Sequence, residues 1–171
     1  MILSREQAKA LADRVLALSK ADETMVTLTG GQRGYLRFAR NSATTSGAST
    51  GYNLAVTASF GKKSGTATTA EFVYPSLQRA VRTAEEIARL SPENPEYMPV
   101  LGAQSYAATN PYFEDVAGVT PGWRASAVAT AIELSKQKEV VSAGFVDTSA
   151  SLLTVASSKG LYGYVRQTAA D

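Results

Sequence analysis

Apolar residues recur at the spacing of an α-helix in three parts of the chain. The first follows a capping-box sequence at residues 4–7 and predicts a helix to about Lys20. A second helix is predicted to open at Pro75 and to end before Pro92, because proline suits a first helical turn and disfavours helix at the preceding residue. A third is predicted to begin at Thr120, with a buried side at Ala125, Val128, Ala129 and Ile132.

Elsewhere the hydrophobic period changes to two, which indicates strands with one face in a core. The glycines between them suggest turns, since positive φ costs least at glycine. The fold class expected is α+β, with an antiparallel or mixed sheet and about three helices packed against it. The predicted strands are residues 24–29, 35–41, 52–60, 64–69, 140–148, 152–157 and 161–168, with turns at Gly30-Gly31, Gly47, Gly51 and Gly61.

A helix followed by strands occurs twice, which indicates a partly repeated unit. We treat residues 1–171 as a single domain with a helix–strand unit at 1–90 and a second at 121–171. Between them, residues 91–120 are rich in proline and predicted to be irregular; such a long segment is usually functional or mobile. The chain ends directly after a predicted strand, so we expect it to be part of a longer protein.

Composition narrows the function classes. The formal net charge is only +2, which does not indicate a nucleic-acid-binding surface. Without cysteine or histidine, the chain can form no disulfide, Ser-His-Asp triad or histidine-based zinc site. We find no leader pattern and no apolar run of roughly 20 residues, and therefore expect a cytoplasmic protein with no membrane partner.

Three local patterns suggest chemistry, and the context of each favours a simpler interpretation. Gly30-Gly31 lie between predicted strands rather than before a helix, so a hairpin turn explains them better than a phosphate loop. The Ser59-x-x-Lys62 spacing matches serine–lysine acyl-enzymes, but Ser59 is not at the start of a helix. Carboxylates alone could hold a metal ion, although solvated charges are the simpler reading of Glu93, Glu96, Glu114 and Asp115.

Aromatic residues gather within or beside the proline-rich segment. One interpretation is local packing that pins a long loop. The other is contact with a partner or peptide, because amphipathic aromatic side chains supply both area and a hydrogen-bonding group. The candidate contact residues are Tyr106, Tyr112, Phe113 and Trp123.

Several short sequence segments, taken in order, resemble the N-terminal domain of the TldD/PmbA family. Its members were once named modulators of DNA gyrase and are now regarded as zinc metalloproteases. The last of these segments is residues 156–161, which differs from the family in having Ser157 where asparagine is usual. The others are residues 19–23, residues 36–42, residues 65–69 and the pattern Leu77-x-x-Ala80-Val81-x-x-Ala84.

The resemblance implies a non-catalytic part of a metallopeptidase that acts on unfolded peptides. Zinc is implied only for an absent C-terminal part, because nothing here matches the family's histidine-glutamate-x-x-x-histidine motif; no cofactor is expected in this chain. The expected partners are a TldD/PmbA-type subunit, in a homodimer or heterodimer, and an unfolded peptide enclosed in a cavity. The alternatives are a stand-alone protein- or peptide-interaction module without enzymatic activity, and a serine- or carboxylate-based enzyme.

Overall fold

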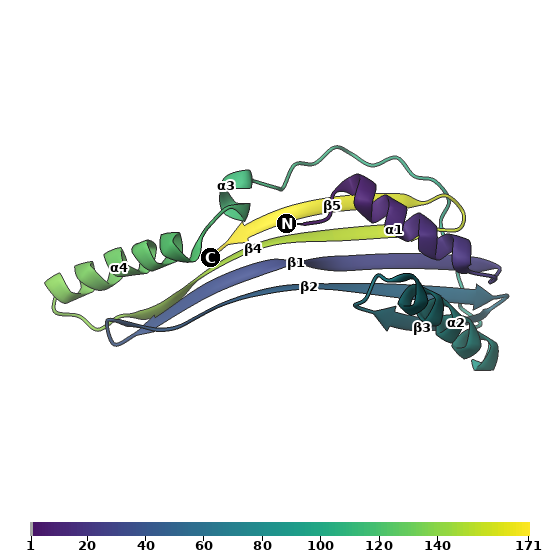
Figure 1. Ribbon diagram of the computed structural model, residues 1–171, viewed down its shortest axis with the longest axis horizontal. Coiled ribbons are helices and arrows are strands. Elements are labelled where there is room, and N and C mark those ends of the chain that lie inside the picture. Colours follow the sequence, from purple (N-terminus) through teal and green to yellow (C-terminus); the bar gives the residue numbers. More distant parts are fainter. Residues whose placement is uncertain (1) are drawn as a thin grey trace.

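A five-stranded antiparallel sheet, in the order β3-β2-β1-β4-β5, organises the chain (Figure 1). The computed structural model describes residues 2–171. The α+β prediction is confirmed, and the helix-then-strands order occurs twice, although both sets of strands join one sheet. The elements are α1 (Arg5–Leu18), β1 (Glu23–Ala39), β2 (Ser42–Phe60), β3 (Lys63–Thr69), α2 (Tyr74–Leu90), α3 (Glu114–Ala117), α4 (Pro121–Gln137), β4 (Ala143–Ser157) and β5 (Tyr162–Ala170).

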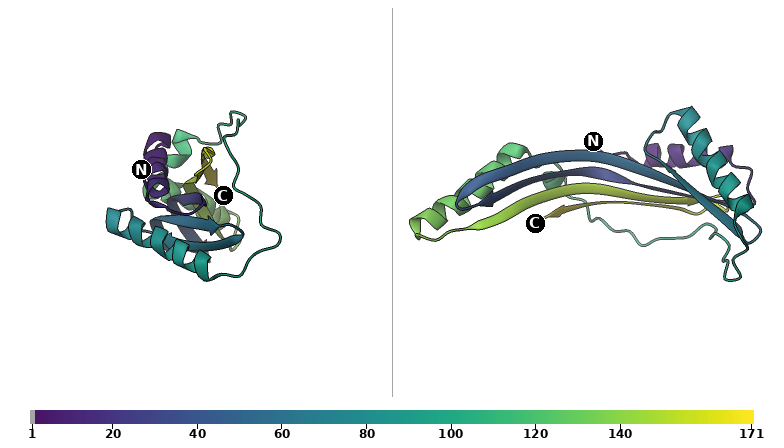
Figure 2. Two further views of the ribbon diagram at one scale, coloured as in Figure 1. Left: turned by 90° about the vertical axis from the view of Figure 1, so that its right-hand side faces the viewer. Right: turned by 90° about the horizontal axis from the view of Figure 1, so that it is seen from below.

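The hydrophobic core lies between one face of the sheet and helices α1 and α2 (Figure 2). Val26 and Leu28 of β1 are fully buried, and the register places Val56 and Leu54 of β2 directly beside them. Because side chains alternate across a strand, the neighbouring residues of β1 face the opposite side. That side carries no helix within residues 2–171, and we call it the open face.

Local capping signals place the starts of α1 and α4 as expected. Ser4 and Gln7 form the reciprocal capping box of α1, and the Thr120 hydroxyl accepts the Trp123 N–H at the start of α4. The predicted buried side of α4 is partly wrong. Arg124 and Val128 are its buried residues, whereas Ala125 and Ala129 are exposed. No helix among the described residues is long and apolar enough to cross a membrane.

The strands are longer than predicted, because several glycines continue a strand instead of turning it. Gly30 and Gly31 lie inside β1, and Gly47 and Gly51 lie inside β2. A Cβ atom on Gly31 would collide with the backbone carbonyl of Ala150 in β4. Glycine is therefore needed here for close approach between strands, so the predicted hairpin turn is wrong.

The β1–β2 turn lies instead at Arg40 and Asn41, which have φ values of 52° and 55°. Two consecutive residues with positive φ form the tight turn favoured by antiparallel hairpins. The Asn41 side chain also accepts the Ser142 N–H at 2.7 Å and donates to the carbonyl of Val140 at 2.8 Å. The predicted turn at Gly61, with φ of 56°, is confirmed.

The proline-rich segment is irregular, as predicted, except for the single turn of α3. After α2 it passes round the side of the sheet opposite to α1 and α2, then follows the outer edge of β5 toward α3 (Figure 2). It thus brings residues from the middle of the sequence against the last strand.

Candidate functional site

The outer edge of β5 carries backbone groups that no other strand pairs. Asp147 and Asp171 exchange both backbone hydrogen bonds, so alternate residues back along β5 turn their N–H and C=O toward β4. Tyr162, Tyr164 and Arg166 belong to the other set and turn these groups away from the sheet. Within the described part of the chain, no backbone hydrogen bond reaches them. This stretch is therefore an open sheet edge.

A strap, residues 102–111, is fastened to the sheet at both ends of this stretch. At one end Gly102 forms an isolated antiparallel bridge with Gly160. At the other, Thr168 donates its N–H to the carbonyl of Pro111 at 3.0 Å. Between these points the strap leaves the edge of β5 (Figure 1). The result is a slot with a sheet edge on one side and an irregular segment on the other.

The space between the strap and the sheet edge is a groove of about 830 Å³. The Tyr106 ring forms part of the strap wall and lies over Gly163, where a Cβ atom would be 3.5 Å from its hydroxyl oxygen. Leu153 and Val155 contribute apolar surface from β4. Apolar walls beside unpaired backbone groups are what an extended peptide needs.

Two tyrosines hold this part of β5 against the N-terminal segment. The Tyr162 hydroxyl donates to the carbonyl of Arg5 at 2.8 Å, and the Tyr164 hydroxyl donates to the carbonyl of Leu3 at 2.8 Å. Burial raises the pKa of both hydroxyls above the ordinary tyrosine value, so both remain donors at neutral pH. The strand is thereby positioned from its helix-covered side, which leaves the edge free.

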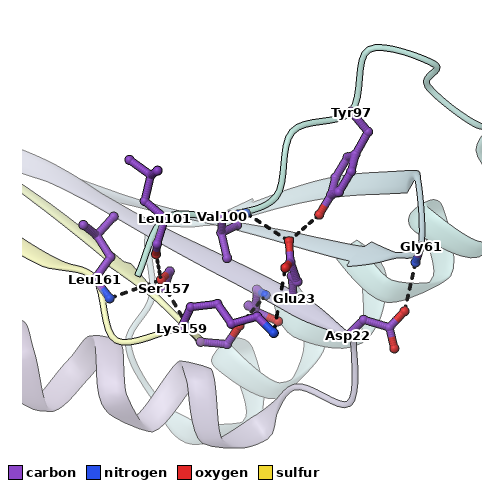
Figure 3. Close-up of polar contacts among 11 residues, drawn as sticks. Asp22, Glu23, Gly61, Tyr97, Val100, Leu101, Ser157, Lys159 and Leu161 are labelled. Carbon is purple, nitrogen blue, oxygen red and sulfur yellow. Dashed lines mark hydrogen bonds and ion pairs between the residues drawn. The ribbon is translucent and has the colours of Figure 1, made fainter. Parts of the chain in front are cut away.

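Glu23, the first residue of β1, anchors the segment that leads into the strap (Figure 3). Its Oε2 accepts the Tyr97 hydroxyl at 2.6 Å and the Val100 N–H at 3.0 Å. Lys159 Nζ lies 3.8 Å from its Oε1. The hydrogen bond from Tyr97, then that from Val100, and finally the charge of Lys159 lower the pKa of Glu23.

Ser157, at the end of β4, fixes the next residue of this segment. Its hydroxyl donates to the carbonyl of Leu101 at 2.7 Å and accepts from the N–H groups of Lys159 and Leu161 (Figure 3). This is the residue that stands where the TldD/PmbA resemblance leads one to expect asparagine. Here it links the β4–β5 turn to the start of the strap.

We predict that this anchor loosens in acid. The folded-state pKa of Glu23 is lowered, so its contribution is complete above the ordinary glutamate pKa of about 4.3 and is lost as the pH falls through the lowered value. NMR signals of the Tyr97 ring and the Val100 amide should shift together between about pH 5 and pH 2, within the range set by these pKa values. Glu23→Gln should abolish that joint titration; an unchanged titration in the variant would assign it to another group.

The far end of the strap is held by Arg166 of β5. Its guanidinium carbon lies 3.8 Å from the centre of the Tyr112 ring, and Nη2 lies 3.4 Å from Glu114 Oε1. The N–H of Phe113 donates to the Thr168 hydroxyl at 3.1 Å. Both ends of the strap are therefore fastened by specific contacts.

The structure separates the four residues predicted to contact a partner. Tyr106 lines the groove, and Tyr112 lies beside it under Arg166. Phe113 and Trp123 are exposed outside it, with Trp123 in the first turn of α4. Contact of the four with a partner remains a prediction. Tyr162 and Arg166 also line the groove; their position opposite the strap depends on pairing between distant segments, which the sequence pattern does not reveal.

The residues singled out for catalysis are arranged differently. The hydroxyls of Ser59 and Ser64 are hydrogen-bonded at 2.9 Å. Glu114 is paired with Arg166, and residues 2–171 contain no group of three or more acidic side chains that could hold a metal ion. The resemblance implies zinc only for a part of the protein other than this chain, and we derive no step through a metal.

Comparison with known proteins finds a family model that matches part of the chain. Residues 26–88, which run from β1 to the last turns of α2, match PmbA/TldA metallopeptidase domain 1. Over this segment the chain is similar to the first domain of PmbA/TldA metallopeptidases. No curated protein sequence matches the chain.

Solved structures share the fold of this chain well beyond the matched segment. TldE from Thermococcus kodakarensis superposes with a TM-score of 0.84 at 16% identity, over 95% of this chain and 37% of its own. A suggested modulator of DNA gyrase from Thermotoga maritima gives 0.82 at 16%, over 95% and 38%. A similarly described protein from Bacteroides thetaiotaomicron gives 0.78 at 12%, over 98% and 40%. The chain thus spans about two fifths of the length of these structures.

Proposed function

We propose that this PmbA/TldA-type domain is a non-catalytic part of a metallopeptidase and holds an unfolded peptide along the edge of β5. The observation that carries the proposal is the set of unpaired N–H and C=O groups at Tyr162, Tyr164 and Arg166, which face the groove beneath the strap. Such an edge offers hydrogen bonds that are independent of side-chain sequence, as an enzyme acting on varied unfolded peptides requires.

The surroundings support an occupant in extended conformation. An exposed sheet edge normally invites unwanted pairing with other chains, and proteins usually cover it or break it with charge. Here the strap lies beside the edge of β5 without pairing along it. A single extended segment could therefore bind between them, whereas a second sheet would collide with the strap. Leu153 and Val155 offer apolar contact to side chains of the bound segment.

The family relationship supports the wider part of the proposal. The catalytic zinc would lie in a part of the protein other than this chain, and a second TldD/PmbA-type subunit, identical or different, would complete a dimer around the peptide-enclosing cavity. This domain would form one wall of that cavity and act in cytoplasmic proteolysis. The match to a metallopeptidase family supports this role, and the short share of the solved structures that the chain spans leaves room for the catalytic part.

Replacing Arg166 with proline tests the edge directly. The Arg166 N–H points away from β4, so proline removes one outward donor without removing a ladder hydrogen bond, as edge strands tolerate. The affinity for a proline-free peptide of about ten residues should fall roughly three- to tenfold below that of Arg166→Ala, the equivalent of one hydrogen bond. Fluorescence anisotropy of the labelled peptide would measure it.

Arg166→Ala is the matched control, because both variants lose the contacts with Tyr112 and Glu114. Circular dichroism would verify that both fold. The same peptide carrying N-methyl groups at alternate residues should bind weakly to every variant. Equal affinities for the alanine and proline variants, together with undiminished binding of the methylated peptide, would disprove pairing at this edge.

A further inference from the structure

Arg124, in the first turn of α4, is buried without a counter-ion. Only 4% of its surface is exposed. Its Nη1 donates to the Thr148 hydroxyl at 2.8 Å and to the carbonyl of Val119 at 3.3 Å, and both acceptors are neutral. Among residues 2–171, no carboxylate forms an ion pair with it. Burying a guanidinium with no opposite charge is costly, so the fold retains this residue against an electrostatic penalty.

The rest of the guanidinium is available to a ligand. Nε and Nη2 have no hydrogen-bond partner in the described part of the chain. They are not sealed in the interior, because the only fully buried side-chain polar atom lacking a partner there is Thr154 Oγ1. These two nitrogens form one side of the planar fork that binds two oxygens of an oxyanion at once.

Arg124 lines a pocket of about 200 Å³. Thr50 brings a hydroxyl from β2, and Gln32 brings an amide from β1 whose Nε2 already donates to the carbonyl of Ala117 at 3.2 Å. None of the lining residues is acidic. Gly34 forms the floor: a Cβ atom there would lie 2.5 Å from Arg124 Nη2, so glycine makes room for the guanidinium. The pocket therefore combines positive charge, hydrogen-bonding groups and space for a small ligand.

The nearest acidic residue in the sequence of β4 does not neutralise Arg124. Asp147 precedes Thr148, and successive side chains of a strand point to opposite faces. Asp147 Oδ2 is instead paired with Arg33 Nε at 2.6 Å, and its register partner is Tyr35, which lies on the open face. The unmatched charge thus belongs to the pocket on the helix-covered face.

We infer that this pocket binds a small oxyanion, a carboxylate or a phosphate group, through the Nε and Nη2 atoms of Arg124. The ligand would supply the missing negative charge, and Thr50 and Gln32 would contribute hydrogen bonds. The site lies on the face opposite the side of the sheet reached by the strap, and it does not depend on the peptide-binding proposal.

An NMR titration of the Arg124 Nε–H signal with sodium acetate and with sodium phosphate tests the inference, with sodium chloride at equal ionic strength as reference. A saturable shift of this signal is expected with at least one oxyanion. Saturation by acetate alone assigns a carboxylate ligand, and saturation by phosphate alone assigns a phosphate. Bound ligand should also raise the melting temperature by about 5–10 °C at a hundredfold excess over the dissociation constant.

Two variants at Arg124 and one control make the result decisive. Arg124→Met fills similar space without charge and should lose the anion-dependent rise in melting temperature. Arg124→Lys keeps the charge but not the fork, and should bind at least tenfold more weakly. Arg14→Met changes an exposed arginine of α1 and should respond like the unmodified chain. A response to chloride as large as that to both oxyanions, or an unchanged response in Arg124→Met, would overturn the inference.

Discussion

Replacing Gly31 with alanine is expected to lower the free energy of unfolding by about 3 kcal/mol. The added Cβ atom would collide with the carbonyl oxygen of Ala150 and would lie 2.8 Å from the Cα atom of Ser151. Both atoms belong to the backbone of β4, so no side-chain rotation can relieve the contact. The two strands would have to separate locally, and the hydrogen bonds between β1 and β4 would weaken. Urea denaturation measures the change.

Gly51 offers an unusually close control, because it is the register partner of Gly31 on β2. A Cβ atom on Gly51 would meet nothing within 4 Å. Gly51→Ala should therefore be neutral or slightly stabilising, since it restricts the unfolded chain at no steric cost. Similar losses in the two variants would show that strand flexibility, and not the approach of β4, determines the need for glycine.

Leu28→Ala is expected to destabilise the fold by about 3–4 kcal/mol. Leu28 is fully buried in the central strand, with Leu54 on one side and Thr154 on the other. Truncation leaves a cavity beneath helices that are fixed by many other contacts, so the surrounding residues cannot collapse fully. The midpoint of urea unfolding should fall while its slope stays constant.

Leu153→Ala serves as the control for the same chemical change. Leu153 is 42% exposed and lies on the open face of β4. Its truncation should cost well under half as much, because less apolar surface returns to water. A larger loss at Leu153 than at Leu28 would mean that the stabilising core lies on the open face, against the burial described above.

Sequence patterns predicted those parts of the fold that are determined locally. The capping box at Ser4 and the Thr120 cap set the start of two helices through contacts within three residues. The two-residue alternation identified strand segments because one face of the sheet is buried. These signals require no knowledge of which segments meet.

Features that depend on distant segments were missed. Gly31 is a residue type typical of turns, and its need in a strand becomes visible only from the close approach of the β4 backbone. Arg124 interrupts the apolar pattern of α4, and its burial depends on the space above Gly34. The groove likewise arises where Pro111 meets Thr168 and Gly102 meets Gly160. Tyr106 was singled out by its aromatic character, but its position over β5 follows from these two fastenings.

The position of β1 in the sheet has a consequence for the order in which the chain assembles. On one side its end, Ala39, pairs with Ser42 across a two-residue turn; on the other it pairs with Ala143. Closing a short loop loses much less chain entropy than closing a long one, so the hairpin can form early and β4 must dock later. The segment that the family model matches, residues 26–88, contains this hairpin together with β3 and most of α2, and it contains no part of β4. The groove combines β4 and β5 with a strap that is anchored on Glu23 of β1 through Val100, so the proposed peptide groove would be complete only after this slower step.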